Sequence, residues 1–259
     1  QAIAAFDIAL WDLKAKRAKL PLAKLLGAQR DSVLCYNTSG GFLSSPLPEV
    51  LKNVEINLER GVKGVKLKVG QPDPMVDYQR VEAVHELVAG RMHLMVDANQ
   101  QWDRVTAQRF GKLVEPLGLT WIEEPLDAYD AEGHATLAAL LDTPIATGEM
   151  LTSVAEHYEL IRHKSVDFIQ PDAPRVGGIT QMLKIMALAE HARLRMAPHF
   201  AMEIHLHLCA TCAQEPWVEH FEWLEPLFNE RLAIKDGRMQ VPARHGLGFS
   251  LSEQARRWT

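Results

Sequence analysis

The chain has 259 residues, 47% of them hydrophobic and 24% charged, and its 28 basic and 33 acidic side chains give a net charge of −5. This composition is typical of a soluble globular protein, and the length is close to the roughly 250 residues of one α/β barrel. Both signs of charge are scattered along the chain, which argues against a nucleic-acid or membrane-surface partner. No apolar run approaches the ~20 residues of a membrane span. Three cysteines are too few for a disulfide framework, so we expect a cytoplasmic protein.

The first residues already show a helical pattern. Apolar side chains recur at helical spacing from Ala2 to Leu26, interrupted by Pro21, which predicts one or two helices that end at Gly27. We therefore expect residues 1–30 to be a helical lead-in. Because the chain opens at Gln1 and not at a methionine, we also expect that an N-terminal portion is missing or that the chain begins inside a larger protein.

Residues 31–225 alternate between short β-branched or aromatic runs and amphipathic helical segments, which predicts a parallel sheet. Eight runs read as strands: 33–39, 64–69, 93–99, 119–125, 144–150, 168–174, 194–200 and 217–221. Eight strands favour a closed barrel over an open sheet, and no glycine-rich nucleotide-binding motif supports the open alternative. Residues 226–259 are expected to form a C-terminal hairpin around 235–238 and a short helix from Leu251.

Charged side chains occupy the carboxyl ends of seven successive predicted strands, where the chemistry of such barrels gathers. A charged group inside a barrel is costly unless it pairs with, or coordinates, something. Taken singly, each of these residues would more often be a solvated loop residue or a salt-bridge partner. Their order and spacing, each about one βα unit from the next, indicate a site instead. They are Lys68, Asp97, Glu123, Glu149, Asp172, His199 and Glu219.

Three consecutive members of this series, Asp97, Glu123 and Glu149, predict a metal site. Oxygen ligands suit a hard cation, and Mg²⁺ takes a few carboxylates while leaving positions for water and substrate.

Two further groups predict acid–base chemistry. Lys66 and Lys68 are two apart on a strand and face the same side, where mutual repulsion is expected to lower an amine pKa toward that of a general base. A pair of lysines that extend to solvent is the alternative. His199 has Asp172 one strand earlier, within reach for a hydrogen bond that would fix the imidazole tautomer. A substrate at the metal would have Lys68 on one face and His199 on the other.

Other motifs in the sequence carry less weight. Cys209 and Cys212 form a C-x-x-C, and His205 and His207 form an H-x-H, but both lie on the predicted helix after the seventh strand. We expect packing or surface positions there. The pair Gly177–Gly178 indicates a tight turn and not a phosphate site.

Together these residues resemble the enolase superfamily, and within it the mandelate racemase subgroup. The resemblance covers essentially the whole chain as the barrel and tail of such a protein, and residues 4–13 are similar to the helix that leads into the barrel. It implies a modified TIM barrel of (β/α)7β type. It also implies an N-terminal α+β capping domain, which we expect to be absent from this chain.

The resemblance assigns a role to each strand-end residue. It implies that Asp97, Glu123 and Glu149 bind Mg²⁺ and that Lys68 and His199 are the acid–base groups. Asp172 would orient His199. The substrate-binding groups would be Lys66, which neutralises a substrate carboxylate, Glu219, which hydrogen-bonds it, and Asn99.

A narrower resemblance concerns the substrate. Residues 68–73, 126–130, 198–205 and 245–249 are similar to the galactarate and L-talarate dehydratases of this subgroup. This implies a six-carbon aldaric acid, removal of its C2 proton to give an enediolate, and loss of the C3 hydroxyl as water. The alternatives are a racemase or epimerase of a 2-hydroxy acid with the same Lys/His pair, and an inactive barrel fragment that binds metal or sugar acids. We also expect a homo-oligomer, although outer-helix residues such as Met182 and Ile185 fit a core better.

Overall fold

Eight parallel strands form the centre of the molecule in a computed structural model that describes residues 1–257. Each predicted strand is present, although all eight are shorter than the predicted runs. The strands are β1 (Ser32–Asn37), β2 (Gly64–Lys68), β3 (His93–Asp97), β4 (Ile122–Glu123), β5 (Ile145–Thr147), β6 (Phe168–Ile169), β7 (Arg195–Met196) and β8 (Trp217–His220).

The strands pair in chain order from β1 to β7, and β1 also pairs in parallel with β8. No strand ladder joins β7 to β8 within the described residues. The seam is bridged instead by a side chain, because the backbone N–H of Phe200, which follows β7, donates to Oε2 of Glu219 on β8 at 2.7 Å. The predicted barrel is therefore confirmed in strand number and order, but its last junction is not a backbone ladder.

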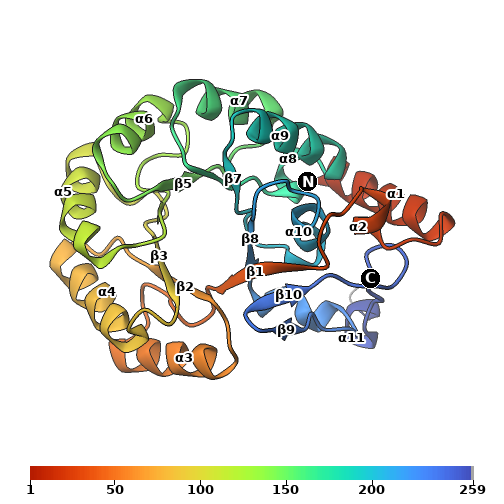
Figure 1. Ribbon diagram of the computed structural model, residues 1–259, viewed down its shortest axis with the longest axis horizontal. Coiled ribbons are helices and arrows are strands. Elements are labelled where there is room, and N and C mark those ends of the chain that lie inside the picture. Colours follow the sequence, from red (N-terminus) through yellow and green to blue (C-terminus); the bar gives the residue numbers. More distant parts are fainter. Residues whose placement is uncertain (258–259) are drawn as a thin grey trace.

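Helices lie outside the strands and connect them (Figure 1). Seven βα units precede β8, which is followed by a 3₁₀ helix, η2 (Glu222–Leu227), so the predicted (β/α)7β arrangement is confirmed. Many of these helices begin at an Asp or Ser whose side chain accepts a backbone N–H, as Asp73, Asp103 and Ser153 do. The connecting helices are α3 (Leu47–Glu59), α4 (Pro74–Val88), α5 (Arg104–Val114), η1 (Glu115–Leu117), α6 (Ala131–Leu140), α7 (Val154–His163), α8 (Ala173–Val176), α9 (Ile179–His191) and α10 (Met202–Cys209).

Side chains alternate between two layers along each strand. On β2, Val65 and Leu67 belong to the apolar layer between strands and helices. Lys66 and Lys68 point the other way, into the barrel, where they meet the carboxylates. Aromatic rings fill the interior, with Tyr36 and Trp121 edge to face at 5.1 Å between centroids. The charged groups therefore lie in a water-poor setting, where they interact strongly.

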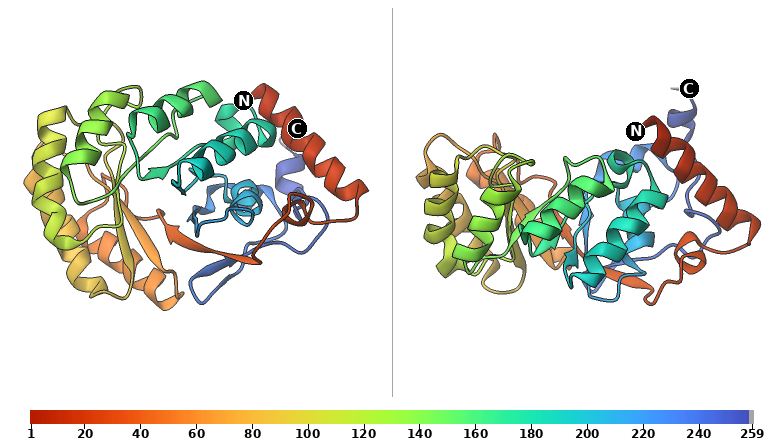
Figure 2. Two further views of the ribbon diagram at one scale, coloured as in Figure 1. Left: turned by 45° about the horizontal axis from the view of Figure 1, so that its top comes forward. Right: turned by 90° about the horizontal axis from the view of Figure 1, so that it is seen from above.

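The two terminal segments meet at one end of the molecule, as both views in Figure 2 show. Backbone N–H of Leu247 in the tail donates to Oδ1 of Asp12 on the first helix at 2.8 Å. The predicted lead-in, hairpin and final short helix are present, although residues 258–259 of the predicted tail lie outside the described residues. The elements are α1 (Ala2–Arg17), α2 (Leu22–Leu25), β9 (Ile234–Lys235), β10 (Arg238–Gln240) and α11 (Glu253–Arg256).

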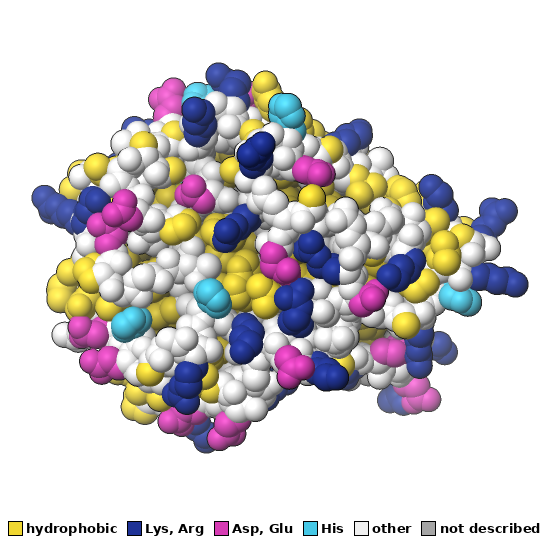
Figure 3. All heavy atoms as spheres, viewed as in Figure 1, with side chains coloured by type: hydrophobic (Ala, Val, Ile, Leu, Met, Phe, Trp, Pro, Cys, Tyr) yellow, Lys and Arg dark blue, Asp and Glu magenta, His cyan; other side chains and the backbone are white. Residues whose placement is uncertain are grey.

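The surface carries charges of both signs. In the view of Figure 3, basic and acidic side chains are interspersed around a central area of hydrophobic side chains. Helix α1 exposes Ile3, Phe6 and Leu10, whereas Met182 and Ile185 are fully buried core residues of α9. No helix among residues 1–257 is both long and apolar enough to cross a membrane.

Helix α1 is tied to the barrel by Asp7, which caps α9. The N-cap residue of α9 is Gly178, which offers no side-chain acceptor. Oδ2 of Asp7 accepts the backbone N–H of Thr180 at 3.0 Å, and Oδ1 accepts its hydroxyl at 2.5 Å. A residue 173 positions away in sequence thus satisfies a free amide at this helix end.

Replacing Asp7 with alanine should lower the free energy of unfolding by about 1 kcal/mol, because it removes this cap. Urea denaturation measures the change. Asp7→Asn, which keeps an acceptor oxygen, is the matched control and should lose less. Equal stability of Asp7→Ala and the parent protein would show that the cap does not contribute.

Candidate active site

The strand-end residues predicted from the sequence meet in one connected network. Nζ of Lys66 lies 2.5 Å from Oε1 of Glu123, 3.1 Å from Oε1 of Glu219 and 3.5 Å from Oδ2 of Asp97. Lys68 forms a second ion pair with Asp97. On the other side of the barrel, Nε2 of His199 lies 3.5 Å from Oε1 of Glu149. Strands β2 to β8 all contribute to this network, because parallel strands present their carboxyl ends at the same mouth.

The three predicted metal ligands lie close enough to share one cation. Each of Asp97, Glu123 and Glu149 is buried, and one carboxylate oxygen from each lies within 4.8 Å of the others. Oxygen ligands of a single Mg²⁺ are about 3 to 4 Å apart, so a small closure suffices. Oε2 of Glu149 is buried with no hydrogen-bond partner, which is unfavourable unless a further group satisfies it. The residues present therefore fit Mg²⁺.

Glu123 is held by neighbours that the sequence analysis did not single out. Its Oε2 accepts from Nε1 of Trp121 at 2.9 Å and from Nε2 of Gln170 at 2.7 Å. Burial raises the pKa of Glu123 to about 7 against the opposing effect of Lys66. Both partners carried a signal in the sequence, because Trp121 lies two residues before Glu123 and so faces the same side, and Gln170 directly follows β6, two residues before Asp172.

The expected low amine pKa at the lysine pair is wrong for Lys66. Burial alone would lower its pKa, but Glu123 and Glu219 raise it well above the ordinary value. Lys66 and Lys68 keep the pKa of Asp97 low despite its burial. The prediction was wrong because the sequence pattern shows the neighbouring lysine but not the carboxylates. These carboxylates belong to other strands and lie at least 57 residues away in the sequence. Lys66 is therefore a buried counter-charge, while Lys68 is about one fifth exposed and lies nearer the mouth.

His199 and Asp172 form the predicted pair. Nδ1 of His199 lies 2.9 Å from Oδ2 of Asp172, which leaves Nε2 facing the carboxylates. Burial alone would lower the pKa of His199, but the hydrogen bond to Asp172 and the charge of Glu149 raise it to about 9. The pKa of Asp172 is lowered, since its hydrogen bond and charge interactions with His199 outweigh burial.

The predicted substrate-binding residues lie at the same mouth. Glu219 is buried, and its Oε1 accepts from the Thr38 hydroxyl at 2.5 Å and from Nζ of Lys66 at 3.1 Å. The charge of Lys66 and the hydrogen bond from Thr38 oppose the effect of burial, and the pKa of Glu219 is lowered to about 2. As an ionised acceptor it could hydrogen-bond a substrate carboxylate only after taking up a proton. Asn99 is the second residue after β3, is half-buried and donates its backbone N–H to Oδ1 of Asp97 at 2.9 Å. The substrate roles of both remain predictions.

Glu124 is a further member of the site that the sequence analysis passed over. Burial and the charge of Glu149 raise its pKa to about 8, and its Oε1 is buried without a partner. Its φ of +40° places it in the left-handed region, which is costly for a non-glycine residue and common at functional sites. The doubled Glu123–Glu124 was the available signal.

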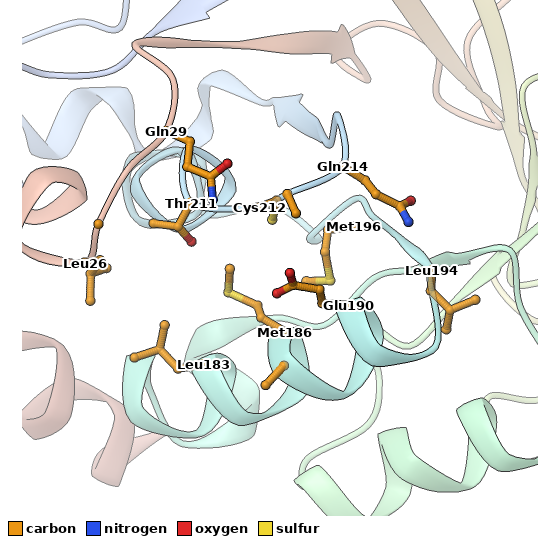
Figure 4. Close-up of a pocket in the computed structure, with 13 residues that line it drawn as sticks. Leu26, Gln29, Leu183, Met186, Glu190, Leu194, Met196, Thr211, Cys212 and Gln214 are labelled. Carbon is orange, nitrogen blue, oxygen red and sulfur yellow. The ribbon is translucent and has the colours of Figure 1, made fainter.

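The weaker motifs lie outside the network. His205 and His207 are fully buried on α10, as expected from packing. Cys209 is buried at the end of that helix, Cys212 is half-buried beyond it, and both are free thiols. A cavity of about 280 Å³ lies near Cys212, between the end of α9 and the residues that enter β7 and β8 (Figure 4). The residues that line this cavity include none of the strand-end residues.

His207 ties the lead-in and the tail to α10. Its Nδ1 accepts the backbone N–H of Ala23 at 3.2 Å, and its Nε2 donates to the carbonyl of Leu247 at 3.0 Å. Protonation would break the first of these bonds, and burial lowers the pKa of His207 to about 4.

Folding should therefore depend on pH through His207. The unfolded imidazole takes up a proton near pH 6.5 and the folded one only near pH 4, so its contribution is complete above pH 6.5 and falls by about 3 kcal/mol as pH drops to 4. Denaturation between pH 7 and 4 measures this slope. His207→Gln should have a shallower slope, and an identical slope in both proteins would contradict the assignment.

Comparison with known proteins identifies the family. Residues 49–255 match the model for the enolase C-terminal domain-like family, and residues 1–27 match the mandelate racemase / muconate lactonizing enzyme N-terminal domain. Parallel strands with carboxylates and two basic groups at their carboxyl ends define the same class. The chain belongs to the mandelate racemase / muconate lactonizing enzyme family of the enolase superfamily.

Two individual relatives and one solved structure are similar to this chain over almost its whole length. The L-talarate/galactarate dehydratase of Salmonella typhimurium is 67% identical over 259 residues, which are 100% of this chain and 65% of that protein. The arabinonate dehydratase of Saccharolobus solfataricus is 33% identical, over 97% of this chain and 70% of its own length. The crystal structure of L-talarate dehydratase from Polaromonas sp. JS666, complexed with Mg and L-glucarate, has a TM-score of 0.97 and 66% identity, covering 100% of this chain and 72% of that one. The chain thus spans slightly less than two thirds of the Salmonella protein.

Proposed function

We propose that this protein is a Mg²⁺-dependent dehydratase of acid sugars such as galactarate and L-talarate. The proposal is supported by the positions of Lys68, at the end of β2, and His199, in the segment after β7. In the strand order, the carboxylates at the carboxyl ends of β3, β4 and β5 lie between them. The 67% identical Salmonella relative is named for this activity, and the Polaromonas structure holds Mg and L-glucarate.

The carboxylates of Asp97, Glu123 and Glu149 would hold Mg²⁺, which supplies positive charge where negative charge develops on the substrate carboxylate. Lys66 adds a buried positive charge, and its ion pairs with Glu123 and Glu219 hold its side chain in place. Trp121 and Gln170 keep Glu123 in place by donating to it. The site is therefore organised before substrate arrives, which reduces the cost of reorganisation during the reaction.

Lys68 and His199 would move the protons. One of them removes the C2 proton, and the other donates a proton to the C3 hydroxyl, so that water leaves and a 2-keto acid forms. Asp172 holds Nδ1 of His199 and so aims Nε2 at the substrate. Return of the proton to the opposite face of C2 would give epimerisation as a side reaction.

The proposal is tested by incubating the purified protein with Mg²⁺ and each of galactarate, L-talarate and an aldonic acid, and by measuring keto acid. The assay uses this chain and the longest product of its reading frame. Formation of a 2-keto acid from an aldaric acid is the expected result. Exchange of the C2 proton without keto acid would indicate a racemase or epimerase instead. No exchange in either protein form, with Mg²⁺ shown to bind, would overturn the proposal.

Two further properties stay predictions. A cytoplasmic location is supported by the three cysteines, which are all free thiols. Assembly as a homo-oligomer is testable by light scattering at several protein concentrations.

A further inference from the structure

His205, on the first turn of α10, forms two hydrogen bonds with backbone groups. Its Nδ1 donates to the carbonyl of Phe200 at 3.0 Å, and its Nε2 accepts the N–H of Ala173 at 3.0 Å. Because a carbonyl only accepts and an amide only donates, these partners select one tautomer of a neutral imidazole, with the proton on Nδ1. The ring is fully buried, so water cannot replace either bond.

Both partners of His205 adjoin the Asp172–His199 pair. Ala173 directly follows Asp172, and Phe200 directly follows His199, so a single imidazole joins the peptides next to two residues that are 27 positions apart. The bond between Asp172 and His199 is formed by side chains of the same two chain segments. His205 therefore fixes the separation of the backbones that carry the pair.

The backbone after His199 needs such a restraint. Phe200 and Ala201 have φ angles of +56° and +28°, in a region that side-chain-bearing residues rarely adopt. Backbone of this kind persists where surrounding contacts determine it fully. Here the Phe200 N–H donates to Oε2 of Glu219 at 2.7 Å, and its carbonyl accepts from His205. Loss of the second contact would free the turn that begins at His199.

We infer that His205 is a positioning residue for the acid–base group His199, acting through the peptides of Phe200 and Ala173. The inference deepens the proposed function and rests on it for its kinetic prediction, while its structural prediction stands alone. A displacement of His199 by about 1 Å is enough to cost one to two orders of magnitude in rate. Substrate contacts elsewhere in the site should be unaffected.

His207 provides the matched control. It lies two residues further along the same helix, is equally buried, and joins two backbone groups in the same manner, but with the opposite tautomer. Its partners, Ala23 and Leu247, belong to the lead-in and the tail. Replacement of His207 therefore removes a similar clamp without touching the peptides beside Asp172 and His199.

The test compares His205→Asn, His205→Gln and His207→Gln in the Mg²⁺-loaded protein. Asparagine can keep the donor near the Nδ1 position, and glutamine can keep the acceptor near the Nε2 position, so each His205 variant retains one of the two bonds. We expect kcat to fall about tenfold or more in both, with KM within roughly twofold of the parent value. His207→Gln should lose thermal stability but keep its kcat.

Nitrogen-15 NMR of the imidazoles supplies a readout that does not need turnover. His205 should show a protonated Nδ1, His207 a protonated Nε2, and the Nδ1 proton shared by His199 and Asp172 should shift in the His205 variants but not in His207→Gln. Unchanged kcat and an unchanged His199 signal in folded His205 variants would overturn the inference, as would a protonated Nε2 on His205 in the parent protein. A parent protein without activity on acid sugars would overturn the proposed function, while the NMR result would still decide the inference.

Discussion

Lys68→Met should reduce the rate of keto acid formation by about a thousandfold, the loss expected when a general acid–base group is removed. Methionine has a similar length but no amine, so it leaves the packing of β2 intact and removes the proton-transfer group. Lys66 cannot replace it, because that cation is buried and paired with Glu123 and Glu219.

The measurement is kcat at saturating Mg²⁺, with metal binding followed separately. Lys112→Met, on the outer surface of α5, is the control and should keep full activity, since Lys112 donates to Glu115 and to the carbonyl of Leu140, which lie outside the network. Full turnover in Lys68→Met with normal Mg²⁺ binding would remove Lys68 from the mechanism.

Glu149→Gln has the second large expected effect, on metal binding. The substitution keeps the shape of the side chain but removes one of three negative charges whose oxygens lie within 4.8 Å. The affinity for Mg²⁺ should fall by about a hundredfold or more. Without metal, the same substitution should change the stability of the fold little, because relief of repulsion from Asp97 and Glu123 is offset by lost attraction to His199 and Arg175.

Thermal denaturation with and without Mg²⁺ separates the effect on metal binding from the effect on the metal-free fold. The parent protein should melt at a higher temperature when Mg²⁺ is added, and Glu149→Gln should not. Glu86→Gln, on the exposed face of α4, is the control and should respond to Mg²⁺ like the parent. A parent-like response in Glu149→Gln would show that the cation binds elsewhere.

Much of the site was predictable because parallel strands repeat a simple geometry. Once the eight strands are placed, the residue at each carboxyl end must face a common mouth, and Asp97, Glu123 and Glu149 follow from that rule alone. The pairing of Asp172 with His199 follows from the adjacency of β6 and β7.

Contacts that depend on a particular fit could not be read from the pattern. The raised pKa of Lys66 results from carboxylates on distant strands, and burial competes with them. At the junction between β7 and β8, the Phe200 amide donates to the Glu219 side chain, in a turn with unusual φ angles that no local residue type requires. The tautomers of His205 and His207 depend on backbone groups that only the folded chain brings to them. For the same reason, the sequence predicted that these histidines are packed in the interior, but it did not predict which backbone groups they bind.

We expect Lys68 and His199 to transfer protons at C2 of an acid sugar held at the carboxylates of Asp97, Glu123 and Glu149. The most direct measurement is proton NMR of L-talarate and galactarate in deuterated water, with the protein and Mg²⁺. We expect loss of the C2 proton signal and growth of the signals of a 2-keto acid, and both should require Mg²⁺. A C2 signal that persists unchanged, while the parent protein binds Mg²⁺ and Glu149→Gln does not, would contradict this expectation.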